Sequence, residues 1–183
     1  MAEAFETERL IIRRWTGNNL EDFHEYCKNP NVGPNAGWKP HETMEESRKI
    51  LRSFISSSEE YAIVLKKSCK AIGSLGLKSD HIPHCGFGKG RELGFVLSQN
   101  YWGRGLMPEA VLGAIRFAFD KINLDYLSAA HFPFNLRSRR VLEKCGFRYE
   151  KTLKDSYTNY KGEKLDEICY IMTREDYFHS VQL

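Results

Sequence analysis

Apolar residues recur every three to four positions in some stretches of the chain and alternate with polar residues in others, which predicts both helices and strands. The helical pattern is clearest beyond residue 105, where Val111, Ala114, Ile115, Ala118 and Ile122 fall on one face. Helices are expected at residues 19–27, 43–55, 106–122 and 135–145, with a short one after Thr173. Strands are expected at residues 8–14, 60–66, 71–77, 91–98, 125–131, 147–154 and 165–172.

This order of elements predicts a mixed α/β (α+β) layer architecture instead of a regular βαβ alternation, because three strands follow one another between the second and third helices. The chain has 183 residues and shows no internal repeat, low-complexity tract or linker. Such a length is typical of one folding unit. We therefore expect a single domain over residues 1–183.

Composition and charge exclude several classes of protein. Apolar residues make up 42% of the chain and charged residues 28%, and the formal net charge is only +3, which does not favour nucleic acid as a partner. No apolar run approaches the roughly 18 residues of a membrane helix. The opening residues MAEAFETERL are too acidic and polar for a secretory signal. We expect no membrane partner and a cytoplasmic protein.

The cysteines favour the same compartment, because their number is odd and no CxxC pair occurs. A disulfide framework or a zinc ribbon is not expected, and a reducing cytosol is the natural setting. His81, His84 and Cys85 are close in sequence, but they lie in a loop with glycine and proline and without a second ligand cluster. We expect them to be structural or exposed, with no bound metal.

The central feature is a turn between a predicted strand and a predicted helix that holds Gly103, Arg104 and Gly105. The free N–H groups of a helix's first turn and the helix dipole favour an anion at this end. Glycines allow a phosphate to approach the backbone, and Arg104 adds a positive charge. The turn therefore suits a pyrophosphate, although a plain tight turn would have the same pattern.

Other phosphate-binding patterns fit less well. A dinucleotide-binding fingerprint would need a third glycine where Pro108 stands, and a Walker loop would need Gly-Lys-Ser/Thr, which the chain lacks. The stretch from Gly86 to Gly90 is also rich in glycine, but it precedes a strand instead of a helix. We interpret it as a connector.

Three separated motifs resemble the GNAT N-acetyltransferases. The pattern Asn-x-x-Gly-x-Gly from Asn100 to Gly105 is similar to the acyl-CoA turn of that superfamily, whose first residue is usually Gln or Arg. Residues 101–110 (YWGRGLMPEA), 7–14 (TERLIIRR) and 135–147 (NLRSRRVLEKCGF) closely resemble the RimJ/RimL-type subfamily, which acetylates ribosomal-protein N-termini. The resemblance implies a twisted, mixed, largely antiparallel sheet of about six to seven strands flanked by about four helices.

The resemblance also implies acetyl-CoA as the co-substrate, with no metal. Backbone N–H groups of the turn, assisted by Arg104, would hold the diphosphate, and the strand before the turn would pair with the pantetheine arm. The strand residues with this role are Phe95, Val96 and Leu97, and the turn residues are Tyr101, Trp102, Gly103, Arg104, Gly105, Leu106 and Met107.

Asn135 and Ser138 lie three residues apart at the start of a predicted helix and so share a face. Periodicity alone indicates an N-cap and a first-turn residue. Ser138 nevertheless falls on the helix face that is expected to point inward, the inward stripe, together with Val141, Leu142 and Cys145. The resemblance implies instead that Asn135 holds the cofactor arm and that Ser138 donates to the leaving sulfur. The opposite face of this helix is lined by Arg137, Arg140 and Lys144 and is expected by default to be a solvated charged face. As an alternative, Arg139 or Arg140 would reach the 3′-phosphate of the cofactor, because an Arg fork suits phosphate.

A base is needed because an α-amino group, with a pKa near about 8, is largely protonated at neutral pH. Glu92, on the strand before the turn, is the first candidate. Asp155, shortly after the penultimate strand, is the second, and His131, at the end of the strand at 125–131, is the third.

The acceptor is expected over the loop at 31–41, with Trp38 as an apolar wall and His41 as a polar rim, unless Trp38 only fills the core beneath the loop. The expected function is direct acetyl transfer in a ternary complex to a primary amine, most of all the N-terminal α-amine of a protein such as a ribosomal protein. A small amine (amino acid, polyamine or antibiotic) and a non-catalytic acyl-CoA-binding sensor remain alternatives, and a nucleotide-binding enzyme is the weakest one. We expect a monomer or a homodimer.

Overall fold

Residues 4–57, 59–81 and 88–181, which the computed structural model describes, form eight strands and five α-helices. The strand beyond the expected six to seven is a short one, and the fifth helix is the short helix expected after Thr173. Strand β1 (Phe5–Glu6) has two residues, too few for a period to show. Helix α5 (Arg174–Val181) follows Thr173, whose hydroxyl accepts a hydrogen bond from the Asp176 amide at 3.2 Å. None of the helices in the described part of the chain is both long and apolar enough to span a bilayer.

The chain divides into two compact units, which we describe one at a time. The first comprises Met1–Gly76 and Phe95–Ala110, and the second comprises Leu77–Gly94 and Val111–Leu183. Three elements contribute residues to both units: β4 (Lys70–Lys78), β5 (Gly90–Leu97) and α3 (Leu106–Arg116). A single domain remains a prediction.

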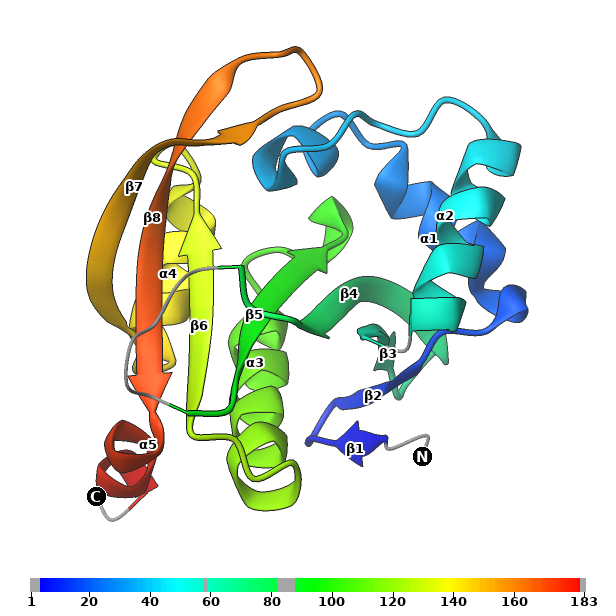
Figure 1. Cartoon of the computed structure of the whole chain (residues 1–183). Coiled ribbons are helices and arrows are strands. Elements are labelled where there is room, and N and C mark those ends of the chain that lie inside the picture. The colour runs from blue at the N-terminus through cyan, green and yellow to red at the C-terminus, as the bar shows by residue number, and fades with distance from the viewer. Residues whose placement is uncertain (1–3, 58, 82–87, 182–183) are drawn as a thin grey trace. The chain divides into compact units, whose positions relative to one another are not determined.

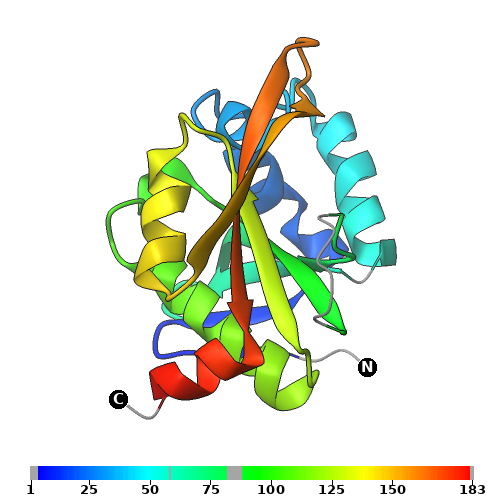
Figure 2. The ribbon, with the colours of Figure 1, turned by 60° about the vertical axis from the view of Figure 1, so that its left-hand side comes forward.

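In the first unit, antiparallel strands follow the order β1-β2-β3-β4, with β2 at Leu10–Arg14 and β3 at Glu60–Leu65. The Ser98 amide, directly after β5, donates to the Ile72 carbonyl of β4 at 2.8 Å. Helices α1 (Leu20–Cys27) and α2 (Met44–Ser57) lie side by side (Figure 1, Figure 2).

The core of the first unit forms because the apolar face of α1 packs against α2 and the strands. Phe23 is 1% exposed, and its ring lies edge-on to Trp15, Tyr26 and Phe54, with centroids 5.2–5.5 Å apart. Burial of an aromatic side chain of this kind contributes about 1.5–3 kcal/mol. The cluster extends through Leu51 of α2 to Ala62, Val64 and Ala71 of the strands.

In the second unit the strand order is β5-β6-β8-β7, with β6 at Tyr126–His131, β7 at Arg148–Thr158 and β8 at Lys164–Thr173. β6 runs parallel to the start of β5, so that Glu92 faces Ser128, and the other pairs are antiparallel. Helix α4 (Leu136–Lys144) lies on one face of these strands, and the β7–β8 hairpin extends past the end of β6 (Figure 1, Figure 2).

Two predicted elements differ in detail. The apolar face expected after residue 105 is confirmed, since Val111, Ala114, Ile115 and Ala118 are buried, but the helix ends in a π-helical turn at Phe117–Lys121. Strand β7 continues past residue 154 to Thr158, so Asp155 lies within it and not after it. Asp155 has a left-handed φ of 51°, and the pairing register shifts around it, which interrupts the alternation that would have revealed the strand.

Candidate functional site

The glycine turn before α3 has two left-handed glycines and an open surface. Gly103 and Gly105 have φ values of 74° and 73°, in the left-handed region that side chains rarely allow. Both glycines and Arg104 are exposed, and no described heavy atom lies within 4 Å of the place where a Cβ on Gly103 would stand. Helix α3 begins directly afterwards, so the N–H groups of its first turn are directed toward this side.

The end of β5 fixes the turn in place. The indole N–H of Trp102 donates to the Leu97 carbonyl at 2.8 Å, and the Tyr101 amide donates to the Ser98 carbonyl at 3.0 Å. Leu97 is buried, whereas Phe95 and Val96 are half-buried. The structure therefore brings together the strand and the turn that the sequence assigned to the cofactor.

Glu109, in the first turn of α3, holds the N-terminal segment against the turn, and sequence analysis did not identify this contact. Its Oε1 accepts from the Thr7 hydroxyl at 2.5 Å and the Arg9 amide at 2.7 Å, and its Oε2 pairs with Arg9 Nε at 2.6 Å. Arg9 Nη1 also donates to the Arg104 carbonyl at 3.0 Å. Burial would raise the pKa of Glu109, but the hydrogen bonds from Thr7 and Arg9 lower it below its usual value.

Arg9 therefore places a guanidinium, paired with the Glu109 carboxylate, beside the turn. Its Nη2 lies 3.6 Å from the position of a Cβ on Gly105. A guanidinium close to exposed backbone N–H groups strengthens an anion site. Arg9 and Glu109 lie in two of the motifs that carry the family resemblance, but only the fold shows that they touch.

In the second unit, Asn135 caps α4, and its Oδ1 accepts from the Ser138 amide at 3.2 Å. The inward stripe is confirmed, since Ser138 and Val141 are half-buried and Leu142 and Cys145 are buried. Burial raises the pKa of Cys145 to about 11, so its thiol stays protonated and is not a nucleophile.

The outer face of α4 carries the two arginines considered for the 3′-phosphate. Arg139 Nε pairs with Glu143 Oε1 at 2.8 Å, which engages its guanidinium on the same helix. Arg140 is exposed. Of the two, Arg140 is therefore the better placed to meet a ligand from solvent.

Glu92 on β5 is a largely buried carboxylate, with 19% of its side chain exposed. Its Oε2 lies 2.7 Å from His81 Nδ1. Burial raises the pKa of Glu92 above its usual value, although the neighbouring His81 opposes that rise. A carboxylate with a raised pKa is a stronger base once it is ionised, as proton abstraction requires.

The other two candidate bases lie in different surroundings. His131 is 4% exposed and ends β6 as predicted; its Nδ1 donates to the Phe132 carbonyl at 2.8 Å, which leaves the lone pair on Nε2. Nε2 is buried and has no hydrogen-bond partner within the part of the chain that the structure describes. Asp155 is exposed, and its amide donates to Asp166 Oδ1 at 3.0 Å.

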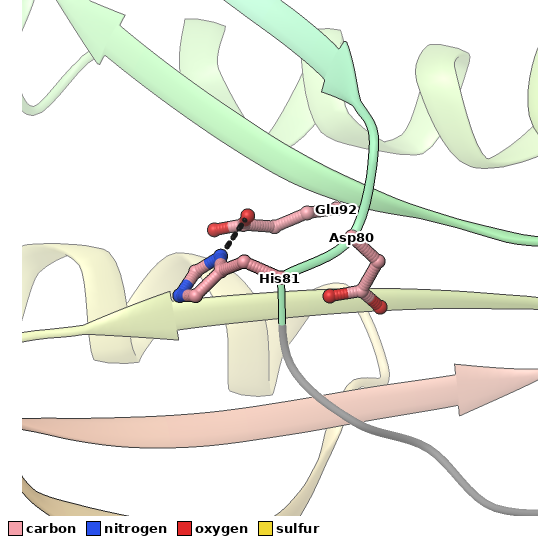
Figure 3. A group of neighbouring side chains, drawn as sticks. All are labelled: Asp80, His81 and Glu92. Carbon is pink, nitrogen blue, oxygen red and sulfur yellow. Dashed lines mark hydrogen bonds and ion pairs between the residues drawn. The ribbon is translucent and has the colours of Figure 1, made fainter.

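Asp80, His81 and Glu92 form a group whose potential ligand atoms lie within 4.8 Å of one another (Figure 3). Two ligands of one tetrahedral Zn²⁺ ion would be about 3.3 Å apart. His81 Nδ1 and Glu92 Oε2 are only 2.7 Å apart, as in a hydrogen-bonded ion pair, and Asp80 Oδ2 accepts from the Ser128 hydroxyl at 2.6 Å. The contacts of this group in the described structure are therefore those of an ion-pair network.

The loop at 31–41 differs from the expectation in one respect. His41 is 7% exposed and so does not form a polar rim; its Nδ1 lies 2.8 Å from the buried Ser47 hydroxyl, which also contacts His24 Nδ1 at 2.7 Å. The hydrogen bond to a buried serine satisfies the imidazole inside the core. Trp38 is half-buried, packs against the core of the first unit and lies 5.4 Å from the His41 ring.

The second glycine-rich stretch is a connector, as predicted, in the part that the structure describes. The Lys89 amide donates to Asp125 Oδ2 at 2.7 Å, and this carboxylate also lies where a Cβ on Gly88 would stand. A carboxylate at these backbone groups would repel a phosphate. His84, Cys85 and Gly86 lie outside the described residues.

The predicted site residues belong to both units. The first contains the turn, Trp38 and His41, and the second contains the three candidate bases and the polar residues of α4. The turn and the end of β5 are in direct contact, as are Asn135 and Ser138. Glu92, His131 and Asp155 each have different partners.

Comparison with known proteins gives a consistent result. The model of the acetyltransferase (GNAT) domain family matches residues 9–148. The N-acetyltransferase p20 of Bacillus licheniformis, described as uncharacterized, is 26% identical over 186 residues, with 96% of this chain and 98% of its own covered. The [ribosomal protein uS5]-alanine N-acetyltransferase of Escherichia coli is 33% identical over 85 residues, 46% of this chain and 43% of its own.

A solved structure supports the fold. An acetyltransferase (GNAT family) from Bacillus anthracis superposes with a TM-score of 0.82 at 24% identity, covering 94% of this chain and 99% of its own.

Proposed function

Because the chain belongs to the acetyltransferase (GNAT) domain family and is an acetyltransferase, we propose that it transfers an acetyl group from acetyl-CoA to the N-terminal α-amine of a protein, such as a ribosomal protein. GNAT acetyltransferases use acetyl-CoA as the donor. The observation that carries the proposal is the exposed glycine turn at the start of α3, braced by Arg9 and Glu109. The partial match to a uS5-alanine acetyltransferase supports the choice of acceptor.

In the first unit, the backbone N–H groups of residues 101–107 bind the diphosphate, and Arg104 and Arg9 add positive charge. Phe95, Val96 and Leu97 pair with the pantetheine arm through their backbone. The left-handed glycines and the anion preference of a helix N-terminus support the role of the turn, and the family resemblance implies the role of the strand.

In the second unit, Glu92 takes the proton that the acceptor amine must lose before or as its nitrogen attacks the thioester carbonyl carbon. The new C–N bond forms as the C–S bond breaks. The Ser138 hydroxyl donates to the departing thiolate, which leaves as the thiol of CoA. His131 is the second candidate base, because it carries a buried lone pair on Nε2, and Asp155 is the third. Asn135 holds the cofactor arm, and Arg140 contacts the 3′-phosphate.

The acceptor lies over the loop at 31–41, where Trp38 is half-buried and offers an apolar surface. A small amine is the alternative acceptor, and the small net charge of +3 favours neither an acidic nor a basic one. We further propose that the protein is a monomer or homodimer and acts in the cytoplasm. A cytoplasmic setting is in keeping with the described cysteines Cys27, Cys69, Cys145 and Cys169, among which there is no disulfide.

Release of the CoA thiol tests this function. Acetyl-CoA is offered with peptides that carry the N-termini of ribosomal proteins, with the same peptides blocked at the N-terminus, and with amino acids and polyamines. Turnover on free N-termini alone supports the proposal, and turnover on small amines alone supports the alternative. Tight acetyl-CoA binding without turnover on any amine would indicate a sensor.

A further inference from the structure

The imidazole of His81 lies between two carboxylates of the second unit. Its Nδ1 is 2.7 Å from Oε2 of Glu92 on β5, and its Nε2 is 3.6 Å from Oε1 of Glu167 on β8. Figure 3 shows the first of these contacts, with the ring directed at the Glu92 carboxylate. Glu92 and Glu167 expose 19% and 8% of their side chains, and His81 exposes 52%, so the cation is the solvent-facing member.

This arrangement favours the imidazolium form of His81. A neutral imidazole has one N–H group, whereas the imidazolium has two and so presents one to each carboxylate. Burial would lower the pKa of His81, but the attraction of Glu92 and then Glu167 outweighs burial and raises it. In the opposite direction, burial raises the pKa of Glu92, and His81 lowers it again.

We propose that His81 is a positioning residue that keeps the Glu92 carboxylate ionised and oriented to accept the proton of the acceptor amine. The proposal rests on the proposed function, in which Glu92 is the base. Burial favours the protonated form of the Glu92 carboxyl, and a protonated carboxyl cannot accept the proton of the amine; the cation of His81 opposes this effect.

Among the residues that the structure describes, His81 is the cation within hydrogen-bonding distance of the Glu92 carboxylate. Asp80 raises the pKa of Glu92 by repulsion, and Lys78 lowers it through an attraction that is weaker than that of His81. Glu167 is held from its other side by the Ser156 hydroxyl at 2.8 Å. Cys169 of β8 has a pKa raised to about 11 and stays neutral. Charge beside Glu92 therefore depends mainly on His81.

The test compares the pH dependence of kcat/KM for His81→Gln and His81→Lys, with an acceptor found in the thiol-release assay. His81→Gln removes the cation, and we expect the acid limb to move about one pH unit higher. The value of kcat/KM would then be lower than in wild type on the acid side of the shifted limb, by at most about tenfold, and would recover as the pH rises. His81→Lys restores a cation and should keep the wild-type limb. His179→Gln, at an exposed histidine of α5, is the matched control.

Three results would overturn the proposal, and they separate it from the proposed function. If the acid limb of kcat/KM is unchanged in His81→Gln while Glu92→Gln is inactive, Glu92 remains the base and His81 has only a structural role. Wild-type turnover in Glu92→Gln removes the base itself, while acetyl transfer stands. A titration of the His81 ring by NMR at or below the ordinary histidine value, unchanged by Glu92→Gln, rules out the pair even if the protein acetylates nothing.

Discussion

Arg9 and Glu109 are 100 positions apart in the chain and form an ion pair, 2.6 Å between Nε and Oε2, beside the glycine turn. The pair is asymmetric in its surroundings, because Glu109 exposes 16% of its side chain and Arg9 exposes 44%. Arg9 also donates to the Arg104 carbonyl inside the turn. The start of the chain therefore fixes the conformation of the turn that follows β5.

We expect Arg9→Ala and Glu109→Gln to weaken acetyl-CoA binding about fivefold to tenfold, the range for a partly exposed pair that orients a binding loop. Isothermal titration calorimetry measures the change directly. The matched control is Arg48→Ala, which removes an exposed arginine paired with Glu45 within α2. Equal affinities for acetyl-CoA in all variants would show that the Arg9–Glu109 ion pair does not influence binding at the turn.

The left-handed glycines give a prediction with an internal control. Gly103→Ala and Gly162→Ala both place a Cβ at a positive φ, 74° and 81°, and neither Cβ would meet an atom within 4 Å. Each should lower the free energy of unfolding by a similar amount, about 1–2 kcal/mol. Only Gly103→Ala should also weaken acetyl-CoA binding, because Gly162 lies in the β7–β8 hairpin.

A larger change at the second glycine of the turn should abolish binding. Gly105→Glu adds both bulk and negative charge where the diphosphate is expected, and we predict no measurable acetyl-CoA affinity. Unchanged affinity in this variant, measured by the same calorimetry, would contradict the assignment of the turn.

Ser138→Ala tests the role of the Ser138 hydroxyl without removing the cap of α4. The cap uses the backbone amide of Ser138, which alanine retains, so stability should change little. We expect turnover to fall about tenfold to a hundredfold while the affinity for acetyl-CoA stays near wild type. Asn135→Ala removes the cap itself and should cost about 1 kcal/mol of unfolding free energy. If Ser138→Ala turns over like wild type, Ser138 is structural.

His41 should make the fold less stable in acid. Burial lowers the pKa of His41, so its neutral form is favoured in the folded state. Below the unfolded pKa of about 6.5 the unfolded chain binds a proton that the folded chain resists, and the unfolding free energy falls as pH decreases. His81, with its raised pKa, acts in the opposite sense. Urea unfolding between pH 7 and 5 should therefore show a smaller acid loss in His41→Gln than in wild type.

The elements around the turn and around α4 could be predicted because their signals are local. The turn is indicated by a glycine pair directly before an apolar helical face. The start of α4 is indicated by an asparagine three residues before a serine, and both patterns lie within about one helical turn. Arg9 and Glu109 lay in recognised motifs, but their contact depends on tertiary structure that no local pattern encodes.

The other differences have a similar origin. His41 follows a loop of polar and small residues, so its burial against Ser47 and Trp38 could not be inferred from its neighbours in sequence. Asp155 lies at a left-handed bulge that breaks the alternation of β7. His81 lies in a loop and Glu92 in a strand. Hydrophobic periodicity predicts elements but not contacts between a loop and a strand, so it could not predict this pair.

The most direct test of the account is a crystal structure of the protein with coenzyme A. The account predicts the diphosphate within hydrogen-bonding distance of the backbone amides of residues 103–107, with Arg9 and Arg104 beside it. Ordered coenzyme A bound elsewhere, with its diphosphate away from these amides, would contradict it.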